Sequence, residues 1–477
     1  MAIINITSVR DELNRLKAEF QRQSDDGALS NENRLLMQGL FTLLELILSI
    51  FLEKNTPKTG RNSSKPSSQT NKDESALVHQ GSKGKGKKEN DESAYNTRTA
   101  ETTTLSEVSV CDVCGEDLSS ASCLGHERRT KIDIIFEKVV EHVDAQIKQC
   151  PTCDHKVKGL FPADMPGPLQ YGNGLKAYII SLLVCQMVAL NRVQKSVKTL
   201  IGQTISEATL LKFVMRLHLA LEDWERSAID KLLLSQAMHV DETSLRVDKK
   251  NHWIHVYAAG DITLKRLHRK RGKEAIEHVD IIPRYGGVII HDCWASYLSY
   301  DHCGHGLCGS HLLRELTFVV DSNGYQWAKR MKGLLQQTCK LVSSSEDKKL
   351  TDRAYKHVQK RYRTIITKGS QEMPVIPEKP GGQRGKMAKS DAHNLWARLK
   401  EHEASVLLFA KESHVSFTNN RAERDLRMSK VKQKVSGCFR TFEYAEAYCR
   451  ISSYLQTMAN KGHNPLIAIQ MALSGRL

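Results

Sequence analysis

The stretch between residues 237 and 292 constrains the fold more than any other part of the chain. Apolar and polar residues alternate over Ala237–Val247, Asn251–Ala258 and Ile262–His268, which predicts three consecutive strands. A helix is expected over Gly272–Ile282, and an apolar strand over Gly287–Asp292. The order predicts a mixed sheet in which three strands run antiparallel and a fourth lies beside the first, after a crossover helix.

Two aspartates occupy matching places in this sheet, which is of the ribonuclease H-like type. Asp241 lies in the middle of the first strand and Asp292 at the end of the fourth, 51 positions later. Residues at these two places lie side by side in that topology. Two carboxylates there can share a divalent cation, and two such ions roughly 3.5–4 Å apart can activate a hydroxyl and stabilise the leaving oxygen of a phosphodiester. The segment therefore predicts a Mg²⁺ or Mn²⁺ site.

A third carboxylate is needed, and in such sites it usually comes from a helix that faces the sheet. Glu423 is the first candidate, since it follows the capping residues at Thr418–Asn420. On spacing alone, Glu315 and Glu242 are rivals. Three arginines recur at every third position on the helix of Glu423 and could hold DNA phosphates, namely Arg421, Arg424 and Arg427.

Four cysteines form two Cys-x-x-Cys knuckles separated by 35 residues. The two-residue gap lets both thiolates of a knuckle reach one tetrahedral ion, and Zn²⁺ accepts four such sulfurs. The sequence therefore predicts a structural zinc site, with a redox pair or metal-free cysteines as alternatives. Strands are expected between the knuckles at Lys131–Ile135 and Val139–Ile147, and Cys123 or His126 could replace one ligand. The predicted zinc ligands are Cys111, Cys114, Cys150 and Cys153.

A helix-turn-helix pattern follows an apolar helix expected over Gly174–Leu190. Residues 191–201 read as a short helix, Gly202 supplies the turn, and Ser206 caps a second helix. Such a pair can place its second helix in the major groove of DNA, although helix pairs joined by a glycine turn are common. Lys195 and Lys198 are the candidate DNA contacts.

The N-terminal region predicts two helical segments within residues 8–53, interrupted at Asp25–Gly27. Their apolar stripe favours either self-association, as a helical hairpin or short coiled coil, or docking on the main body. The stretch Leu36–Leu52 is expected to be too polar and too short to span a membrane, and no secretory signal is expected. Residues 54–105, with the basic run Gly81–Lys88, are predicted to be a linker without stable structure.

The charge of the chain points to a polyanionic partner. Lys and Arg number 70 against 54 acidic residues, a formal net charge of +16. Nucleic acid is the commonest partner of such an excess. The twelve cysteines, without a predicted export signal, favour a reducing compartment, so we expect a cytoplasmic protein that associates with the nucleoid when it is bound to DNA.

Several motifs together resemble the large transposase of the insertion sequence 66 family, and the resemblance covers nearly the whole chain. The order of modules matches as well. One departure is Asp154, where relatives often have Gly after the second knuckle. The motifs are His239-Val-Asp-Glu-Thr243, Asn251–Ala258, His291-Asp-Cys-Trp-Ala-Ser-Tyr297, Cys308-Gly-Ser-His-Leu-Leu-Arg-Glu-Leu316, Asn419-Asn-Arg-Ala-Glu-Arg-Asp-Leu-Arg427 and Lys461-Gly-His-Asn-Pro465.

The resemblance implies a DDE-type transposase with the acidic triad Asp241, Asp292 and Glu423, and so favours Glu423 over its rivals. It implies a helical insertion in the 131-position interval between Asp292 and Glu423. The implied partners are the terminal inverted repeats of the mobile element, target DNA, further copies of the chain and two small accessory proteins. Alternatives are a metal-dependent nuclease on the same fold, a catalytically silent DNA-binding protein and a zinc-only regulator.

The Cys308-x-x-His311 pair lies where many DDE transposases carry such a pair. Its neighbours His302, Cys303 and His305 raise the alternative of a second metal site. We favour a different interpretation, in which Cys308 packs in the core. His311 and Arg314 would then begin a helix near the active site and orient DNA.

The expected fold class is thus multidomain α+β. It comprises N-terminal helices at 1–53, the linker at 54–105, the zinc module at 106–160 and a helix-turn-helix-like region at 161–235. The ribonuclease H-like catalytic core follows at 236–322, a helical insertion at 323–412 and the C-terminal helices of the core at 413–477.

Overall fold

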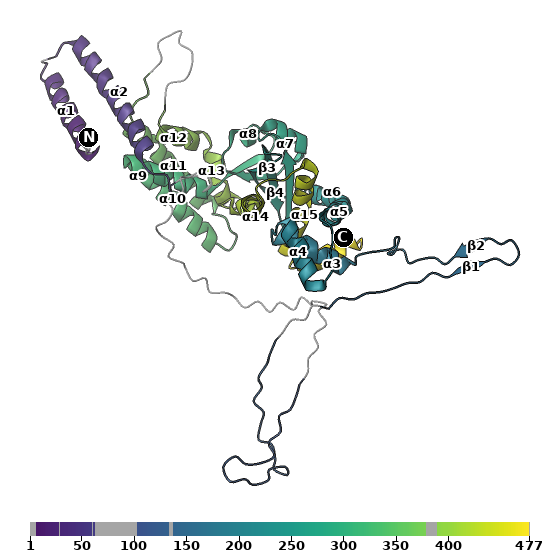
Figure 1. The fold of residues 1–477 in the computed structure, drawn as a ribbon. Coiled ribbons are helices and arrows are strands. Elements are labelled where there is room, and N and C mark those ends of the chain that lie inside the picture. Colours follow the sequence, from purple (N-terminus) through teal and green to yellow (C-terminus); the bar gives the residue numbers. More distant parts are fainter. Residues whose placement is uncertain are drawn as a thin grey trace, which may run out of the picture. The chain divides into compact units, whose positions relative to one another are not determined.

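The predicted strands form one sheet in the computed structural model, which describes residues 6–27, 29–59, 61–62, 103–132, 137–377 and 389–476. β3 (Ala237–Val247), β4 (Lys250–Ala259) and β5 (Ile262–His268) run antiparallel to one another. β6 (Val288–His291) lies parallel to β3, and β7 (Gly304–Leu307) lies parallel to β6. The order is β5-β4-β3-β6-β7, so the fourth strand lies beside the first as predicted, whereas β7 was not predicted. Figure 1 labels β3 and β4 of this sheet.

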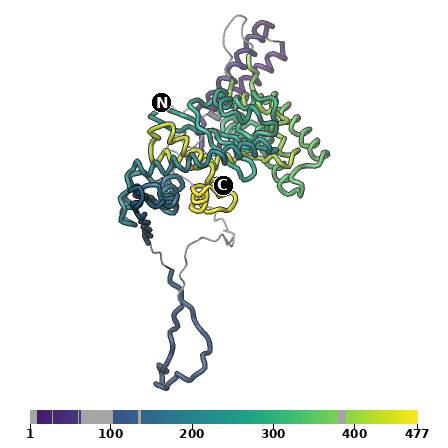
Figure 2. Tube along the Cα trace, turned by 90° about the vertical axis from the view of Figure 1, so that its right-hand side faces the viewer, coloured from purple at the N-terminus to yellow at the C-terminus, as the bar shows by residue number. Residues whose placement is uncertain are grey.

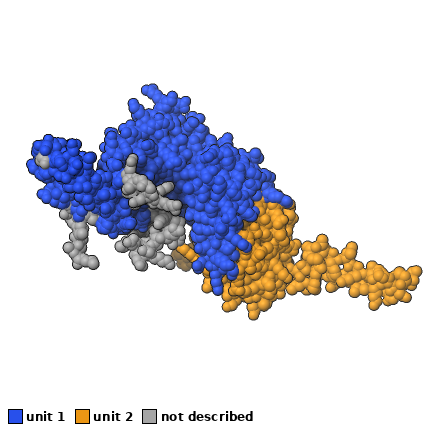
Figure 3. Space-filling view, turned by 90° about the horizontal axis from the view of Figure 1, so that it is seen from above, with its two compact units in different colours: residues 1–85, 226–430 blue, residues 86–225, 431–477 orange. Residues whose placement is uncertain are grey.

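The chain divides into two compact units (Figure 3), residues 1–85 with 226–430 and residues 86–225 with 431–477. The first, unit 1, contains the sheet and the helices between Asp292 and Glu423. The second, unit 2, contains the cysteine knuckles, the helix-turn-helix-like region and the last helices. Of the residues expected as the C-terminal part of the catalytic core, 413–477, only 413–430 fall in the unit that holds the sheet.

The two faces of the sheet pack against different helices because successive strand residues point to opposite sides. Met238 and Val240 are fully buried against Ile276 of α7 (Lys273–Val279). On the other face, Ile290 packs with Phe409 at the end of α13 (Glu403–Lys411). The predicted crossover helix is therefore confirmed but shorter than Gly272–Ile282, because Asp280 adopts a left-handed conformation with φ 57° and ends it.

Helices fill the interval between the second and third candidate carboxylates, as expected. After the short helix α8 (Ala295–Leu298) and the strand β7, and before α14 (Asn420–Ser436), they are α9 (Gly309–Asn323), α10 (Gln326–Ser344), α11 (Asp352–Glu372), α12 (Asp391–Glu401) and α13. Figure 2 shows these green helices gathered beside the teal strands. Their shared core includes Trp327 and Tyr362, each no more than 1% exposed. The helical bundle is thus a packed extension of unit 1.

The N-terminal helices form a hairpin, with α1 (Ile6–Asp25) followed by α2 (Asn31–Asn55). Phe20 and Phe41 pack at 5.4 Å between ring centroids, and the end of α2 docks on α9 and α12. There, buried Glu53 accepts hydrogen bonds from the backbone N–H groups of Asp391 and Ala392. The C-terminal end of α2 therefore docks on the main body, which was one of the two predicted arrangements. Leucines nearer the start of α2 are exposed.

The length of α2 corrects one expectation. The stretch Leu36–Leu52 was expected to be too short and too polar for a membrane span, but it belongs to a 25-residue helix. Among the described residues, α2 alone is long and apolar enough to cross a membrane by these two criteria. The C-terminal end of this helix is docked within unit 1, where Glu53 accepts hydrogen bonds from the start of α12.

In unit 2, the two helices of the predicted helix-turn-helix begin and end close to the predicted residues. α4 (Leu190–Ile201) ends at Gly202 with φ 66°, and α5 (Glu207–Ala220) begins after Ser206, whose side chain accepts from Thr209 N–H. The preceding helix is not continuous as expected over Gly174–Leu190. It consists of α3 (Asn173–Ile180) and a π-helical turn (Ser181–Cys185), and the chain then breaks at Met187 with φ 56°.

The last two helices of the chain pack within unit 2. α15 (Phe442–Asn460) contacts α5, and α16 (Pro465–Leu473) contacts α3 and α5. Arg450 of α15 donates to the carboxylate of Glu225 at 2.8 Å. Glu225 lies in α6 (Glu222–Leu233). The C-terminal helices thus stabilise the helix-turn-helix-like region.

The cysteine segment has less strand structure than expected. A strand was predicted over Val139–Ile147, but only its last residue belongs to β1 (Ile147–Gln149), which pairs with β2 (Lys156–Lys158) around the second knuckle. Residues 133–135 of the predicted strand Lys131–Ile135 lie outside the described residues, as do residues 63–102 of the expected linker, including Gly81–Lys88.

Candidate active site

Asp241 and Asp292 come from adjacent parallel strands. His239 of β3 pairs with Ile290 of β6. Asp241 and Asp292 each lie two residues after these paired positions. Paired positions share one side of a sheet, so both carboxylates face the side on which Ile290 packs against α13. The same alternation turns the adjacent Glu242 to the opposite face.

The two aspartates lie in an electrostatically unfavourable position for free carboxylates. Burial raises the pKa of Asp241 well above its usual range, and the negative charges of Glu242, Asp292 and Glu423 raise it further. Burial also raises the pKa of Asp292, although Trp294 N–H donates to Asp292 Oδ1 at 3.1 Å. A cation bound between them would lower both pKa values, because positive charge stabilises the carboxylate form.

Glu423 lies on α14 (Asn420–Ser436) beside two basic residues of α9. Glu423 Oε1 is 3.5 Å from His311 Nδ1 and 4.0 Å from an Arg314 nitrogen. Among the described residues this oxygen is buried without a hydrogen bond. Burial and the charge of Arg314 lower the pKa of His311 to about 4, so its imidazole is neutral near pH 7. A buried acceptor of this kind fits a cation.

Asn419 fixes the start of α14 against β3. Its side-chain nitrogen donates to Val240 O at 2.8 Å, directly before Asp241, and its side-chain oxygen is 3.0 Å from His239 Nδ1. Its backbone N–H donates to Cys308 Sγ at 3.1 Å. Asn419 therefore joins the three elements that carry Asp241, Glu423 and His311. The sequence placed Asn419 among the capping residues of this helix but indicated no contact with the strand of Asp241 or with Cys308.

Both rivals of Glu423 are engaged elsewhere. The Glu242 side chain is 1% exposed, accepts from Arg271 at 2.6 Å and from Tyr297 Oη at 2.7 Å. Arg271 lies over the rings of Trp253 and Trp294, at 5.1 and 4.5 Å from their centroids. Glu315 pairs with Arg398. Each rival thus has an arginine that neutralises it.

The donor set fits divalent cations. Asp241, Asp292 and Glu423 supply carboxylate oxygens, the ligands that Mg²⁺ and Mn²⁺ prefer. Their oxygens do not form one group within 4.8 Å; among the described residues, such a group consists of Cys308, His311 and Glu423. Two ions roughly 3.5–4 Å apart do not require all three carboxylates around one ion.

The residues expected to form a second metal site with Cys308 and His311 have other partners. His302 Nε2 lies 3.0 Å from Ile282 O, and Cys303 is buried in the core beneath the sheet. His305 Nδ1 lies 3.1 Å from His291 Nε2. Cys308 is 1% exposed and precedes α9, in agreement with the interpretation that it packs in the core.

Three of the predicted basic residues line a pocket with Glu423. The pocket, of about 470 Å³, contains Arg314, Arg424 and Arg427. Arg421 does not join them, since its guanidinium donates to Ile262 O at 3.0 Å and burial lowers its pKa. The other lining residues are Ser310, Leu313 and Asn420.

The remaining candidate residues lie in unit 2. Lys195 and Lys198 are exposed on α4. In each knuckle, hydrogen bonds from backbone N–H groups lower the pKa of the first thiol. The donors to Cys111 are the N–H groups of Cys114 and Val113. The donors to Cys150 are the N–H groups of Thr152 and Cys153. Such groups favour thiolates, the form that binds metal. The zinc assignment remains a prediction.

One comparison identifies the chain's relatives. The model of the Transposase IS66 family matches residues 168–447, which include the sheet, the helical bundle and all three candidate carboxylates. No curated protein matches the chain. Because the matched segment covers more than half of the sequence, the chain belongs to the IS66 family of transposases.

Proposed function

We propose that this chain catalyses metal-dependent cleavage and strand transfer of DNA at the ends of a bacterial insertion sequence. The observation that carries the proposal is the proximity of Asp241 to two other carboxylates. Asp241 and Asp292 occupy matching places along adjacent parallel strands, and the negative charges of Asp292 and of Glu423 on α14 both help to raise the pKa of Asp241. The β5-β4-β3-β6-β7 order supports a ribonuclease H-like core. Family membership supports transposition as the process.

Asp241, Asp292 and Glu423 would hold Mg²⁺ or Mn²⁺. The ions would supply Lewis acidity, activating a water or a 3′-hydroxyl and stabilising the leaving oxygen. The chain's own contribution is positional. Asn419 fixes Glu423 relative to Asp241, while His311 keeps a neutral imidazole near pH 7 beside Glu423.

The pocket beside Glu423 suits the approach of a phosphodiester. Arg314, Arg424 and Arg427 offer guanidinium groups there, and guanidinium forms paired hydrogen bonds with phosphate oxygens. His311 lies on the same helix as Arg314 and would orient the strand. Arg421 instead anchors α14 to β5 through Ile262 O.

Other parts of the chain would recognise DNA and assemble the complex. Lys195 and Lys198 on α4 would contact the backbone near the element's ends. The four cysteines Cys111, Cys114, Cys150 and Cys153 would hold a structural Zn²⁺. Joining two ends requires at least two active sites, so we propose a homo-oligomer acting in the cytoplasm on nucleoid DNA. Two small accessory proteins of the same element would complete the machinery.

A strand-transfer assay tests the function. The purified protein would be incubated with labelled duplexes of the element's own ends, target DNA and Mg²⁺ or Mn²⁺. We expect joined products with wild type and none with Asp241→Asn, Asp292→Asn or Glu423→Gln. Glu274→Gln, an exposed carboxylate of α7, is the matched control and should retain activity.

Two outcomes would favour the alternatives. Metal-dependent nicking without joining, even with the accessory proteins added, would indicate a nuclease on the same fold. Tight binding of the ends without cleavage in either metal would indicate a silent DNA-binding protein.

A further inference from the structure

Helix α11 carries a stripe of polar and basic side chains that the proposed active site does not use. Its members recur every three or four positions, so they share one face of the helix. Val358, Tyr362 and Ile365 are buried on the opposite face in the core of the helical bundle. The stripe consists of Lys356, Gln359, Lys360, Arg363, Thr364, Thr367, Lys368 and Gln371.

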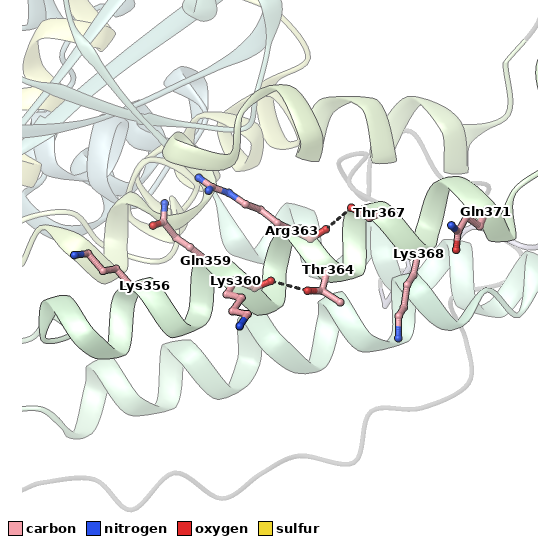
Figure 4. A pocket seen from close by; sticks show the side chains of 8 residues that line it. All are labelled: Lys356, Gln359, Lys360, Arg363, Thr364, Thr367, Lys368 and Gln371. Carbon is pink, nitrogen blue, oxygen red and sulfur yellow. Dashed lines mark hydrogen bonds between the residues drawn. The ribbon is translucent and has the colours of Figure 1, made fainter.

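These eight residues line a shallow pocket of about 660 Å³ (Figure 4). The lining includes no carboxylate and no large apolar side chain. Thr364 and Thr367 donate their hydroxyl hydrogens to the backbone oxygens of Lys360 and Arg363, as the dashed lines show. The lysines are therefore the principal donors that the stripe offers to a ligand.

The charge of the stripe is only partly neutralised. Arg363 pairs with Glu403 at 2.9 Å, and Gln359 donates to the same carboxylate at 3.2 Å. Lys356, Lys360 and Lys368 are exposed, and none of them forms an ion pair within the described part of the chain. Three positive charges thus remain on one helix face.

The neighbouring helix strengthens the positive field. α10 contacts α11 and carries Lys329, Arg330, Lys332 and Lys340 without any acidic residue. An interface for another protein would ordinarily include aromatic or aliphatic anchors, which the stripe lacks. A polyanion is the ligand class that such a surface attracts.

The length of the stripe suits a nucleic acid backbone. Lys356 and Lys368 are twelve positions apart, which is about 18 Å along a helix. That length corresponds to about five base pairs at 3.4 Å each, with one phosphate per strand at every step. An extended row of phosphates can therefore meet all three lysines at once.

We propose that this face of α11 binds the phosphodiester backbone of duplex DNA through Lys356, Lys360 and Lys368. The inference rests on the proposed function, because that function supplies the duplex. The contact is to phosphate, so it carries no sequence information. The duplex can be target DNA or the element's own end, and the two are separated by the substrates of the test.

The test measures DNA affinity of the full chain against salt concentration. The triple variant Lys356→Gln/Lys360→Gln/Lys368→Gln should reduce the slope of log affinity against log salt by roughly 3, since each lost phosphate contact removes about 0.9. The corresponding triple Lys→Arg variant keeps the charge and should keep the wild-type slope. Substitution of three exposed lysines elsewhere in unit 1, Lys249, Lys250 and Lys411, by Gln is the matched control.

Two duplexes distinguish the source of the phosphates. A reduced slope with random-sequence DNA alone assigns the stripe to target DNA, and a reduced slope with end DNA as well assigns it to both. An unchanged slope with both duplexes, or an equal reduction in the control variant, overturns the proposal. Failure of the proposed function would look different, because Mg²⁺-dependent cleavage would be absent while the salt slope of wild type stayed steep.

Discussion

His291 and His305 form a hydrogen bond of 3.1 Å between Nε2 and Nδ1, directly before the second candidate metal ligand. Cys293 N–H donates to His291 Nδ1 at 3.1 Å, which leaves the proton of His291 on Nε2 for His305. His305 Nε2 lies 3.2 Å from Tyr300 O and donates to it. This chain of hydrogen bonds holds the turn that presents Asp292.

Replacing His305 by Ala should destabilise this turn. The buried Nε2–H of His291 would lose its acceptor, at a cost of about 1–3 kcal/mol. We expect a lower melting temperature and fewer joined products, with partial recovery in His305→Gln, whose side-chain oxygen can accept. A melting temperature of His305→Ala equal to that of wild type would show that these hydrogen bonds do not stabilise the protein.

Arg271 should be important for stability as the partner of buried Glu242. Arg271→Ala would leave a carboxylate with 1% exposure without its cation, which typically costs about 3–5 kcal/mol. Urea unfolding would measure the change. Arg284→Ala removes an exposed pair with Asp280 and should change stability by less than about 1 kcal/mol. Equal effects of the two variants would contradict the role of Glu242 as a buried, paired group.

His255 should make the protein sensitive to mild acid. It is 1% exposed on β4, and burial lowers its pKa from 6.5 to about 4. Below pH 6.5 the imidazole of His255 is protonated in the unfolded chain but stays neutral in the folded chain. Proton binding therefore favours unfolding, and the free energy of unfolding decreases as the pH falls from 6.5 towards 4. Between pH 6.5 and 5 the loss is about 2 kcal/mol. His255→Leu should lose less over that interval in urea titrations, and an identical loss would contradict the assignment.

Zinc content tests the four-cysteine module. Wild type should contain about one zinc ion per chain by mass spectrometry, and Cys150→Ser should lose most of it. Cys339→Ser on α10 is the control and should keep the metal. Zinc that persists in Cys150→Ser would contradict the proposed ligand set.

The sequence predicted the parts of the site that depend on short-range pattern. Strict alternation located β3, β4 and β5 nearly to the residue, and with them Asp241. The Gly202 turn and the Ser206 cap were likewise predicted, because each acts within one helical turn. The separation of Asp241 from Glu242 onto opposite faces follows from the same alternation.

Features that depend on distant contacts were not predicted. β7 contains Gly304 and Gly306, which give no apolar periodicity. At Gly306 a Cβ atom would lie 3.0 Å from a Val415 methyl group, so the glycine allows a residue distant in the chain to pack closely on this strand. The partners of Asn419 lie 111 to 180 positions away in the chain, so no local pattern could reveal its role.

Manganese binding tests the central claim most directly, that Asp241, Asp292 and Glu423 hold the metal ions. Free Mn²⁺ would be titrated by electron paramagnetic resonance with end DNA present. Wild type and Glu274→Gln should bind about two ions per site, with affinity that rises with pH because raised pKa values require Asp241 and Asp292 to lose protons first. Asp241→Asn, Asp292→Asn and Glu423→Gln should each bind fewer ions, and wild-type binding in these three variants would contradict the account.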